Sequence, residues 1–211
     1  MRLFIGAGIG VLAGLIGAAI WAAISYYGNV EIGWIAWAIG AAVGFAVAVG
    51  TSGEGGATPA TIAVVIAAAS VLGGKYAATA MHVDEVIDAQ HIVVTDEVAI
   101  TYVCDSLLEE AFEEGEPMTW PDGRDVEGGY TQSDYPADLW TEAETLYASW
   151  SPDEQAAYRE DIQAMVDDAE SIVASIAREE GFMSSFSAFD LLWGFLALGT
   201  AFKIAFAGTS K

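Results

Sequence analysis

The side chains with the widest chemical capacity gather in one short acidic stretch of this 211-residue chain. Histidine, aspartate and glutamate ligate metal ions, and five such residues stand close together here: His82, Asp84, Glu85, Asp88 and His91. The two histidines are nine positions apart, about 2.5 helical turns, so an unbroken helix directs them to opposite sides. One ion reaches both only if the helix is broken, so the sequence favours no metal site here.

A second acidic group lies further along, among several glycines. Asp122, Asp125 and Glu127 have some likeness to a calcium loop, but the Asp-x-Asp-x-Asp-Gly spacing and the glutamate at the twelfth position are absent. We therefore expect no calcium site. The run from Glu109 to Glu116 is interpreted as a solvated helix face.

The sequence also contains no motif that indicates covalent catalysis. Cys104 is the only cysteine, which excludes an intramolecular disulfide, and its apolar neighbours indicate a buried thiol rather than a nucleophile. The glycine-rich stretch 51–58 lacks the lysine of a phosphate-binding loop, and no Gly-x-Ser-x-Gly or His-Glu-x-x-His motif occurs. The sequence thus predicts no catalytic residue, no cofactor-binding residue and no enzyme.

Two charged residues stand inside apolar stretches. Lys75 lies about 8 Å inside one predicted span and Asp190 about 5 Å inside another, by the rise of a helix, and both spans flank the same acidic segment. Each side chain has the alternative of reaching water at the membrane surface. The competing hypothesis is an intramembrane ion pair between Lys75 and Asp190, because an isolated charge in the bilayer is costly.

These residues must be positioned by long apolar helices. Residues 31–50 hold one charge, Glu31, and about 20 apolar residues cross the hydrocarbon core of a bilayer. Similar stretches cover 3–25, 59–81 and 187–207, and a secretory signal peptide is the alternative for the first of them. We expect an all-α membrane protein with four transmembrane helices and a mostly helical acidic extra-membrane domain between spans three and four. The expected parts are a three-helix membrane region, the acidic domain, and the fourth span with a short tail: 1–80, 81–186 and 187–211.

Small residues recur every fourth position in the first two spans. They form one stripe in each span and are expected to be helix-packing residues: Gly6, Gly10, Gly14, Ala36, Gly40 and Gly44. The link between these spans is short and contains Gly28 and Asn29, so the spans form an antiparallel hairpin. We expect the two stripes to face each other.

Basic residues and aromatic residues indicate the orientation. Arg2 precedes the first span, and Lys203 and Lys211 lie near or beyond the end of the fourth. Basic residues that flank a span are retained in the cytoplasm. We therefore expect a protein of the bacterial inner (plasma) membrane with both termini in the cytoplasm and residues 81–186 outside it. Lys75 counts weakly against this orientation. The aromatic residues of the spans gather toward the other face: Trp21, Tyr26, Tyr27, Trp34, Trp37, Tyr76 and Trp193.

The acidic segment dominates the charge of the chain. Residues 81–186 hold 27 Asp and Glu against three arginines, a net charge of −24, whereas the whole chain carries −23. A nucleic-acid partner is excluded, because phosphate binding requires lysine and arginine. The acidity is consistent with simple solubility or a salty habitat, with attraction of cations to a pore, and with repulsion from anionic lipid.

Local signals predict helices in the acidic segment. Thr95 begins one helix as its N-cap and Gly115 ends it, and Ser151 begins another with a capping box to Glu154. We expect that second helix to stop at Gly181, and the third span to begin with Thr58 as its cap. Apolar residues of the second helix follow a coiled-coil spacing: Tyr158, Ile162, Met165, Ala169, Ile172 and Ile176. This seam packs within its own domain or contacts a second copy or a membrane-protein partner through the 152–180 helix.

Four segments together resemble a known kind of protein. EIGWIAWAIG, FDLLWGFLALGTAFK, TWPDG and YPADLW are similar to segments of uncharacterised bacterial four-span membrane proteins. The resemblance covers most of the chain and implies the same four-span fold, with the acidic helical domain before the last span. It implies no activity and no functional residue.

The function expected from the sequence is that of a non-enzymatic integral membrane protein. Its partner is the lipid bilayer, and it acts as a scaffold, an accessory subunit or a sensing subunit. The alternative is an oligomeric cation channel or transporter whose acidic domain gathers cations, and a membrane hydrolase ranks third. Transporters carry polar groups near the middle of the membrane, and the first two spans have none there, which favours the first function.

Overall fold

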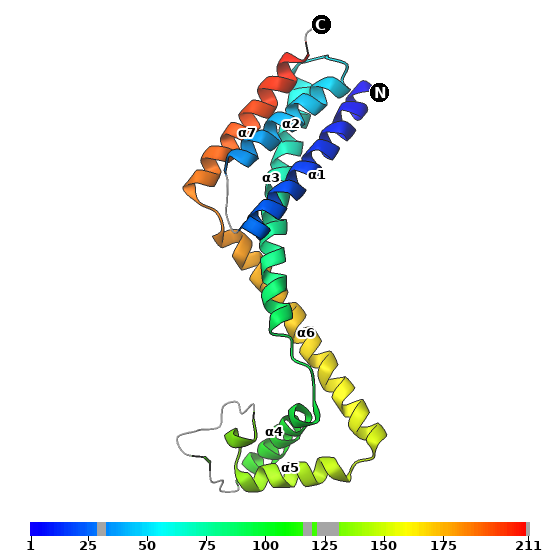
Figure 1. Ribbon diagram of the computed structural model, residues 1–211, viewed down its shortest axis with the longest axis vertical. Coiled ribbons are helices and arrows are strands. Elements are labelled where there is room, and N and C mark those ends of the chain that lie inside the picture. The colour runs from blue at the N-terminus through cyan, green and yellow to red at the C-terminus, as the bar shows by residue number, and fades with distance from the viewer. Residues whose placement is uncertain (29–32, 116–119, 122–130, 210–211) are drawn as a thin grey trace. The chain divides into compact units, whose positions relative to one another are not determined.

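The described part of the chain is built from helices. The computed structural model describes residues 1–28, 33–115, 120–121 and 131–209, and within them it contains no strand. The elements, coloured along the chain in Figure 1, are α1 (Arg2–Gly28), α2 (Trp34–Gly50), α3 (Ala57–Ala89), α4 (Asp96–Glu114), η1 (Gln132–Asp134), α5 (Ala137–Ser149), α6 (Pro152–Ser184) and α7 (Ala188–Ala207). The all-helical expectation is confirmed for these residues.

The chain divides into two compact units whose boundaries differ from the expected ones. The first unit combines Met1–Ala89 with Val173–Lys211, and the second is Gln90–Ile172. The expected boundaries lay at residues 80 and 187. The difference arises because α3 continues to Ala89 and the last turns of α6 pack against it, as the Arg178–Asp84 ion pair shows.

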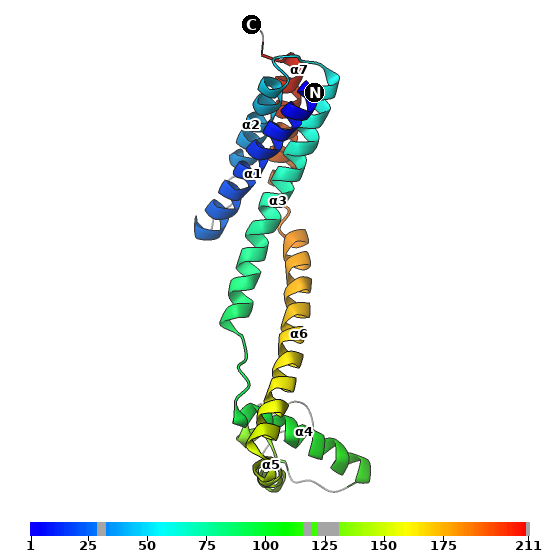
Figure 2. The ribbon, with the colours of Figure 1, turned by 90° about the vertical axis from the view of Figure 1, so that its right-hand side faces the viewer.

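Four helices of the first unit form a bundle. α1 packs against α2 and α3, and α7 packs against α2 and α3, as Figures 1 and 2 show from two directions. By length and composition α1, α3 and α7 are able to cross a membrane. α2 is equally apolar but has 17 residues, and residues 29–32 before it lie outside the described part of the chain.

The bundle has small side chains inside and large ones outside. Most of its deeply buried residues, those at most 1 % exposed, are alanines, and Val43, Val47 and Thr51 accompany them: Ala36, Ala48, Ala60, Ala63, Ala67, Ala197, Ala201 and Ala205. Large apolar side chains more than half exposed cover the surface: Phe4, Leu12, Leu15, Ile16, Phe45, Val65, Leu191 and Phe195. A water-soluble domain buries its large apolar residues, whereas helices in lipid meet through small ones.

The stripe of α2 packs against α7. A Cβ atom added to Gly40 would lie 2.2 Å from the carbonyl oxygen of Ala197, and one added to Gly44 would lie 2.8 Å from that of Ala201. Backbone therefore meets backbone between α2 and α7. The expectation that the stripes of α1 and α2 face each other is wrong, because the alanines of α7 recur every fourth residue and offer α2 a flatter surface.

The stripe of α1 receives side chains of α2 and α3 instead. A Cβ atom added to Gly10 would lie 2.6 Å from Cγ2 of Val47, and one added to Gly14 would lie 2.1 Å from Oγ of Ser70. Gly10 and Gly14 thus make room for branched and polar side chains. Gly6 differs, because a Cβ atom added to Gly50 would lie 2.5 Å from Cα of Gly6, so backbone meets backbone at that end of α1 and α2.

The second unit packs around the helices α4, α5 and the first part of α6. Its buried core combines residues from all three and from the turn before α5: Ala99, Val103, Cys104, Tyr135, Leu139, Trp140, Ala143, Tyr147, Ile162 and Val166. The aromatic rings of Tyr147, Trp150 and Tyr158 meet edge to face at the junction of α5 and α6, with centroids 5.4 and 5.0 Å apart in turn. Aromatic pairs of this geometry favour a fixed angle between two helices.

Helix signals that depend on near neighbours are confirmed. The hydroxyl of Thr95 accepts a hydrogen bond from the amide of Val98, and Gly115 ends α4 with φ at 73°. The amide and hydroxyl of Ser151 both donate to Oε2 of Glu154, at 2.8 and 2.7 Å. These bonds satisfy backbone groups that an isolated helix end leaves unpaired.

Two predicted helix boundaries are wrong. α3 begins at Ala57, so Thr58 lies inside its first turn rather than serving as its cap. α6 continues through Gly181 to Ser184, and a Cβ atom at Gly181 would lie 3.0 Å from Cγ2 of Thr79. The glycine therefore permits a close approach to α3 instead of ending α6.

The predicted seam of α6 is only partly correct. Ile162 is 2 % exposed and packs in the second unit, but Met165 and Ile176 are more than half exposed. The buried stripe follows Val166 and Ala174 instead. Polar contacts explain the change, because Gln163, Glu170 and Arg178 all pair with residues 84–94 and rotate α6 toward them. The contact of the 152–180 helix with a partner stays a prediction.

Candidate functional site

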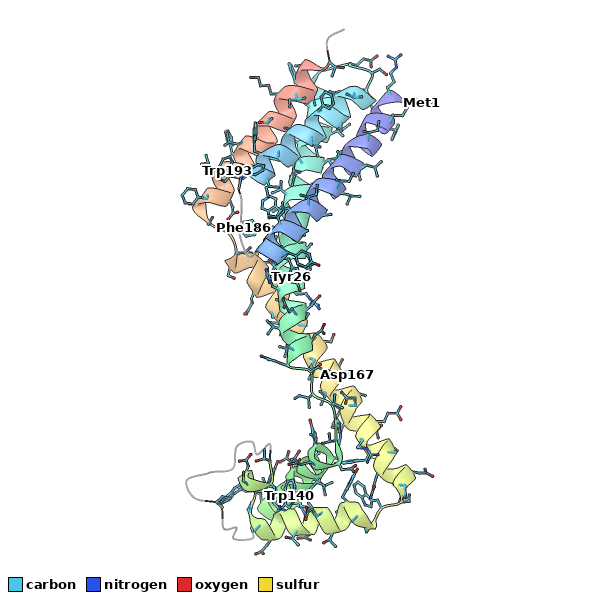
Figure 3. All side chains as sticks on the ribbon, viewed as in Figure 1. Met1, Tyr26, Trp140, Asp167, Phe186 and Trp193 are labelled. Carbon is cyan, nitrogen blue, oxygen red and sulfur yellow. The ribbon has the colours of Figure 1, made fainter. Side chains whose placement is uncertain are left out.

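Lys75 of α3 and Asp190 of α7 form an ion pair in the first unit. Nζ of Lys75 lies 3.2 Å from Oδ1 of Asp190, and the two side chains are 3 % and 15 % exposed. The ring of Phe186 lies 5.3 Å from the same ammonium group. Phe186 stands between the last turn of α6 and the first turn of α7, as Figure 3 shows. Ion pairing and the aromatic face together compensate the desolvation of the ammonium group.

The start of α7 holds the carboxylate of Asp190 in place. Ser187 donates to Oδ2 of Asp190 from both its amide and its hydroxyl, at 2.7 Å each. In return the hydroxyl of Ser187 accepts from the amide of Asp190 at 3.4 Å. One carboxylate oxygen therefore completes the helix cap while the other faces Lys75. Loss of Asp190 would weaken both the beginning of α7 and its attachment to α3.

The tryptophan and tyrosine residues of the bundle lie toward the end that holds this ion pair, whereas Phe4, Phe202 and Phe206 lie toward the other end. The opposite end holds the N-terminus, the 51–56 loop and the end of α7, joined by the Arg2–Glu54 ion pair at 2.5 Å and the bond from the Gly56 amide to the carbonyl of Phe206 at 3.0 Å. Trp34 and Tyr27 are 56 % and 81 % exposed, as suits residues at a membrane surface. Trp21 is 3 % exposed and belongs to the core rather than to such a belt.

The five residues 82, 84, 85, 88 and 91 do not form one cluster. The ring of His82 lies 5.1 Å from that of Tyr26, and Oδ1 of Asp84 accepts from Arg178 at 2.6 Å. α3 ends at Ala89, so His91 belongs to the segment that follows and contacts Glu170 of α6. The helix thus ends between the histidines, and each has its own contact within its unit, Tyr26 for His82 and Glu170 for His91.

The structure brings His91 together with two residues that the sequence analysis missed. Asp167 and Glu170 lie three positions apart on α6, and their carboxylates approach the imidazole of His91. An acidic pair at this spacing is a recognisable signal, but nothing in the sequence links it to a histidine so far away. Asp122, Asp125 and Glu127, considered above for calcium, lie outside the described residues.

A polar network connects the three helices of the second unit. The hydroxyl of Tyr147 donates to Oδ1 of Asp96 at 2.8 Å, and the guanidinium of Arg159 donates to both Asp96 and Tyr147. Burial, followed by the hydrogen bond to Asp96, raises the pKa of Tyr147. The network joins α4, α5 and α6 and has the arrangement of a structural contact.

Cys104 lies fully buried in the core of the second unit. Burial, with smaller contributions from Asp105 and Glu144, raises the pKa of its thiol to about 12. This environment agrees with the interpretation of a buried thiol rather than a nucleophile.

We expect Cys104 to resist thiol reagents in the folded protein. At pH 8 a thiol with a pKa of about 12 is ionised in only about one molecule in ten thousand, and the thiolate is the reacting form. Mass spectrometry after a maleimide pulse should find label only when denaturant is present. Labelling of the native protein at the rate of a free cysteine would contradict this expectation.

The fold and its buried ion pair are those of a class of proteins, the helical membrane proteins. An apolar helical bundle with large side chains on its surface is the architecture of a membrane protein, and three of its helices have the required length. Comparison with known protein families, with curated proteins and with solved structures finds no match for this chain.

Proposed function

We propose that this protein is a non-enzymatic integral membrane protein, a scaffold, accessory or sensing subunit with an acidic extracytoplasmic domain. The observation that carries the proposal is the reversed packing of the bundle, with alanine and glycine inside and large apolar side chains outside. Leu12, Leu15 and Phe195 would have no favourable neighbour in water, whereas lipid chains solvate them.

α2 is the fourth span in this proposal. Its 17 residues rise about 26 Å, slightly less than the hydrocarbon core, and it packs against α1, α3 and α7. Its neighbours cover one side of α2, and its exposed apolar residues Trp37, Phe45 and Val49 would face lipid on the other. The chain therefore crosses the membrane four times, with both termini on the cytoplasmic side and residues 81–186 outside.

We expect a cysteine placed at Glu142 to react with a membrane-impermeant maleimide in intact bacterial spheroplasts. Glu142 is an exposed residue of α5, and the wild-type chain supplies the background because Cys104 is buried. A cysteine at Glu54, in the loop beside the N-terminus, is the matched control and should react only after the membrane is permeabilised. The reverse pattern would show that the orientation is inverted.

The interior of the bundle favours a scaffold or sensor over a transporter. Among the described residues of the first unit, the buried polar or charged ones are Ser25, Thr51 and Lys75. Ser25 lies in the last turn of α1, Thr51 follows α2, and Lys75 is level with the first turn of α7, where it pairs with Asp190. The middle is filled by alanine and glycine in close contact, together with the buried apolar side chains of Ile39, Val43 and Val47. A transport pathway needs polar groups or water at that depth.

An oligomeric cation channel is the second candidate, because the buried ion pair of Lys75 and Asp190 is of a kind that transport proteins use. Cation flux into proteoliposomes discriminates between the two functions. We expect flux equal to that of protein-free vesicles. Flux above that level, lost in Asp190→Asn, would establish the channel instead; Glu31, the other acidic residue considered for this role, lies outside the described residues.

Contacts with other molecules follow from the same proposal. The lipid bilayer is the principal partner, and the exposed apolar face of the 152–180 helix is where a second copy or another membrane protein would dock. Nucleic acid is not a partner, because the acidic segment would repel its phosphates.

A further inference from the structure

Two carboxylates and one imidazole converge in the second unit. Asp167 and Glu170 lie on the same face of α6, because residues three apart are neighbours on a helix, and Figure 3 labels Asp167 there. His91 comes from the non-helical segment between α3 and α4. The ligand atoms of the three side chains all lie within 4.8 Å of one another.

Hydrogen bonds to α6 hold the segment that carries His91. Gln163 accepts from the amide of Val94 at 2.9 Å and donates to the carbonyl of Ile92 at 3.1 Å. Oε1 of Glu170 accepts from the amide of Ile92 at 3.1 Å. Because the backbone of Ile92 and Val94 is hydrogen-bonded to α6, the preceding residue, His91, is held next to Glu170 on that helix.

Each carboxylate is oriented through one of its oxygens. The amide of Ile92 binds Oε1 of Glu170, and the side chain of Gln163 donates to Oδ1 of Asp167 at 2.8 Å. The second oxygen of Glu170, Oε2, lies 2.8 Å from Nδ1 of His91. Outer hydrogen bonds of this kind fix the direction of carboxylates that bind metal ions in other proteins.

We propose that His91, Asp167 and Glu170 bind a divalent first-row transition-metal ion, for which Zn²⁺ is the probe. One imidazole nitrogen with two carboxylate oxygens is a donor set that such ions accept, whereas Ca²⁺ and Mg²⁺ prefer oxygen alone. Zn²⁺ bonds of about 2.0–2.2 Å require the ligand atoms to draw closer together. The side chains of His91 and Glu170 are 43 % and 22 % accessible, so solvent and ions reach the site. Three protein ligands leave the fourth position to water.

Ion binding at this site is independent of the membrane topology proposed above, because all three ligands belong to the second unit. The acidic surface around them raises the local concentration of cations. For the same reason, weak binding of any divalent cation is expected everywhere on this unit. The test must therefore separate a defined site from general attraction.

Titration calorimetry of the full chain in detergent micelles, with Zn²⁺ in the presence of excess Mg²⁺, provides that separation. We expect one Zn²⁺ per chain, with affinity at least about ten-fold lower in His91→Gln and in Glu170→Gln, since loss of even an outer partner of a metal ligand costs about 10–100-fold. Two matched controls should bind as the wild type does. His82→Gln removes the other histidine, and Asp168→Asn removes one charge from an exposed neighbour of Asp167.

Equal losses in Asp168→Asn and Glu170→Gln, or unchanged affinity in His91→Gln, would overturn the site and leave only diffuse attraction. The wild-type chain gives a second readout that needs no variant. It has two histidines, so their ring signals in ¹⁵N-resolved NMR are separately assignable. Zn²⁺ should shift the signals of His91 and leave those of His82 in place, and a shift at His82 alone would refute the proposal.

Discussion

Gly40→Ala should lower the free energy of unfolding of the bundle by about 3 kcal/mol, the upper range for overpacking a core. The added Cβ atom would lie 2.2 Å from the carbonyl oxygen of Ala197 and 2.7 Å from its carbonyl carbon. Both are backbone atoms, so no side chain can rotate away, and α2 and α7 must separate along their contact. Unfolding of the purified chain in detergent, followed by circular dichroism, measures the loss.

Gly194→Ala and Gly73→Ala are the matched controls for this prediction. Both glycines lie inside helices of the same bundle, and a Cβ atom at either has no heavy atom within 4 Å. Alanine is the better helix former, so neither change should destabilise the protein. Gly10→Leu, by contrast, should destabilise it, because the added atoms meet the side chains of Val47 and Ile66. Equal stability of Gly40→Ala and Gly194→Ala would mean that α2 and α7 do not meet through Gly40.

The second large effect is expected at the ion pair of α3 and α7. Asp190→Asn leaves the ammonium of Lys75, 3 % exposed, without its carboxylate, and removing one partner of a buried pair costs about 3–5 kcal/mol. Lys75→Met should cost less, because Ser187 still donates two hydrogen bonds to the carboxylate of Asp190. The melting temperatures of the two variants in nanodiscs measure this difference, and we expect the lower value for Asp190→Asn.

The double variant Lys75→Met with Asp190→Asn tests whether the two residues act together. It removes both charges at once, so we expect it to be more stable than either single variant. Ser187→Ala separates the helix cap from the ion pair and should cost about 1 kcal/mol. Strictly additive losses in the cycle would show that Lys75 and Asp190 contribute separately.

Much of the secondary structure could be predicted because its causes are local. Thr95 and Ser151 cap helices through atoms no more than three residues away, and the apolar stretches are continuous in sequence. The depths of Lys75 and Asp190 within their spans could also be predicted, because they depend only on the number of residues from the end of each helix. The sequence was therefore enough to place these two charges at the same level, beside the same end of the bundle.

The sequence did not predict how each helix is rotated about its own axis, that is, which of its faces contacts which neighbour. α1 and α2 both carry small stripes, but Gly40 packs against Ala197, whereas Gly10 receives Val47. The choice depends on all the surfaces that compete for each stripe, and the alanines of α7 are about 160 residues away in the chain from the stripe of α2. Gly181 illustrates the same point, because its role is a close contact with Thr79 and not the end of a helix.

The helices, their apolar character and the acidic segment follow from local sequence, because composition and capping act over a few residues. Which helix faces meet depends on tertiary packing. Polar contacts of Gln163 and Glu170 with the backbone of residues 92–94 rotate α6 away from its apolar period and expose Met165. The same contacts bring His91 to Asp167 and Glu170 across more than seventy residues, and no local pattern specifies such a meeting.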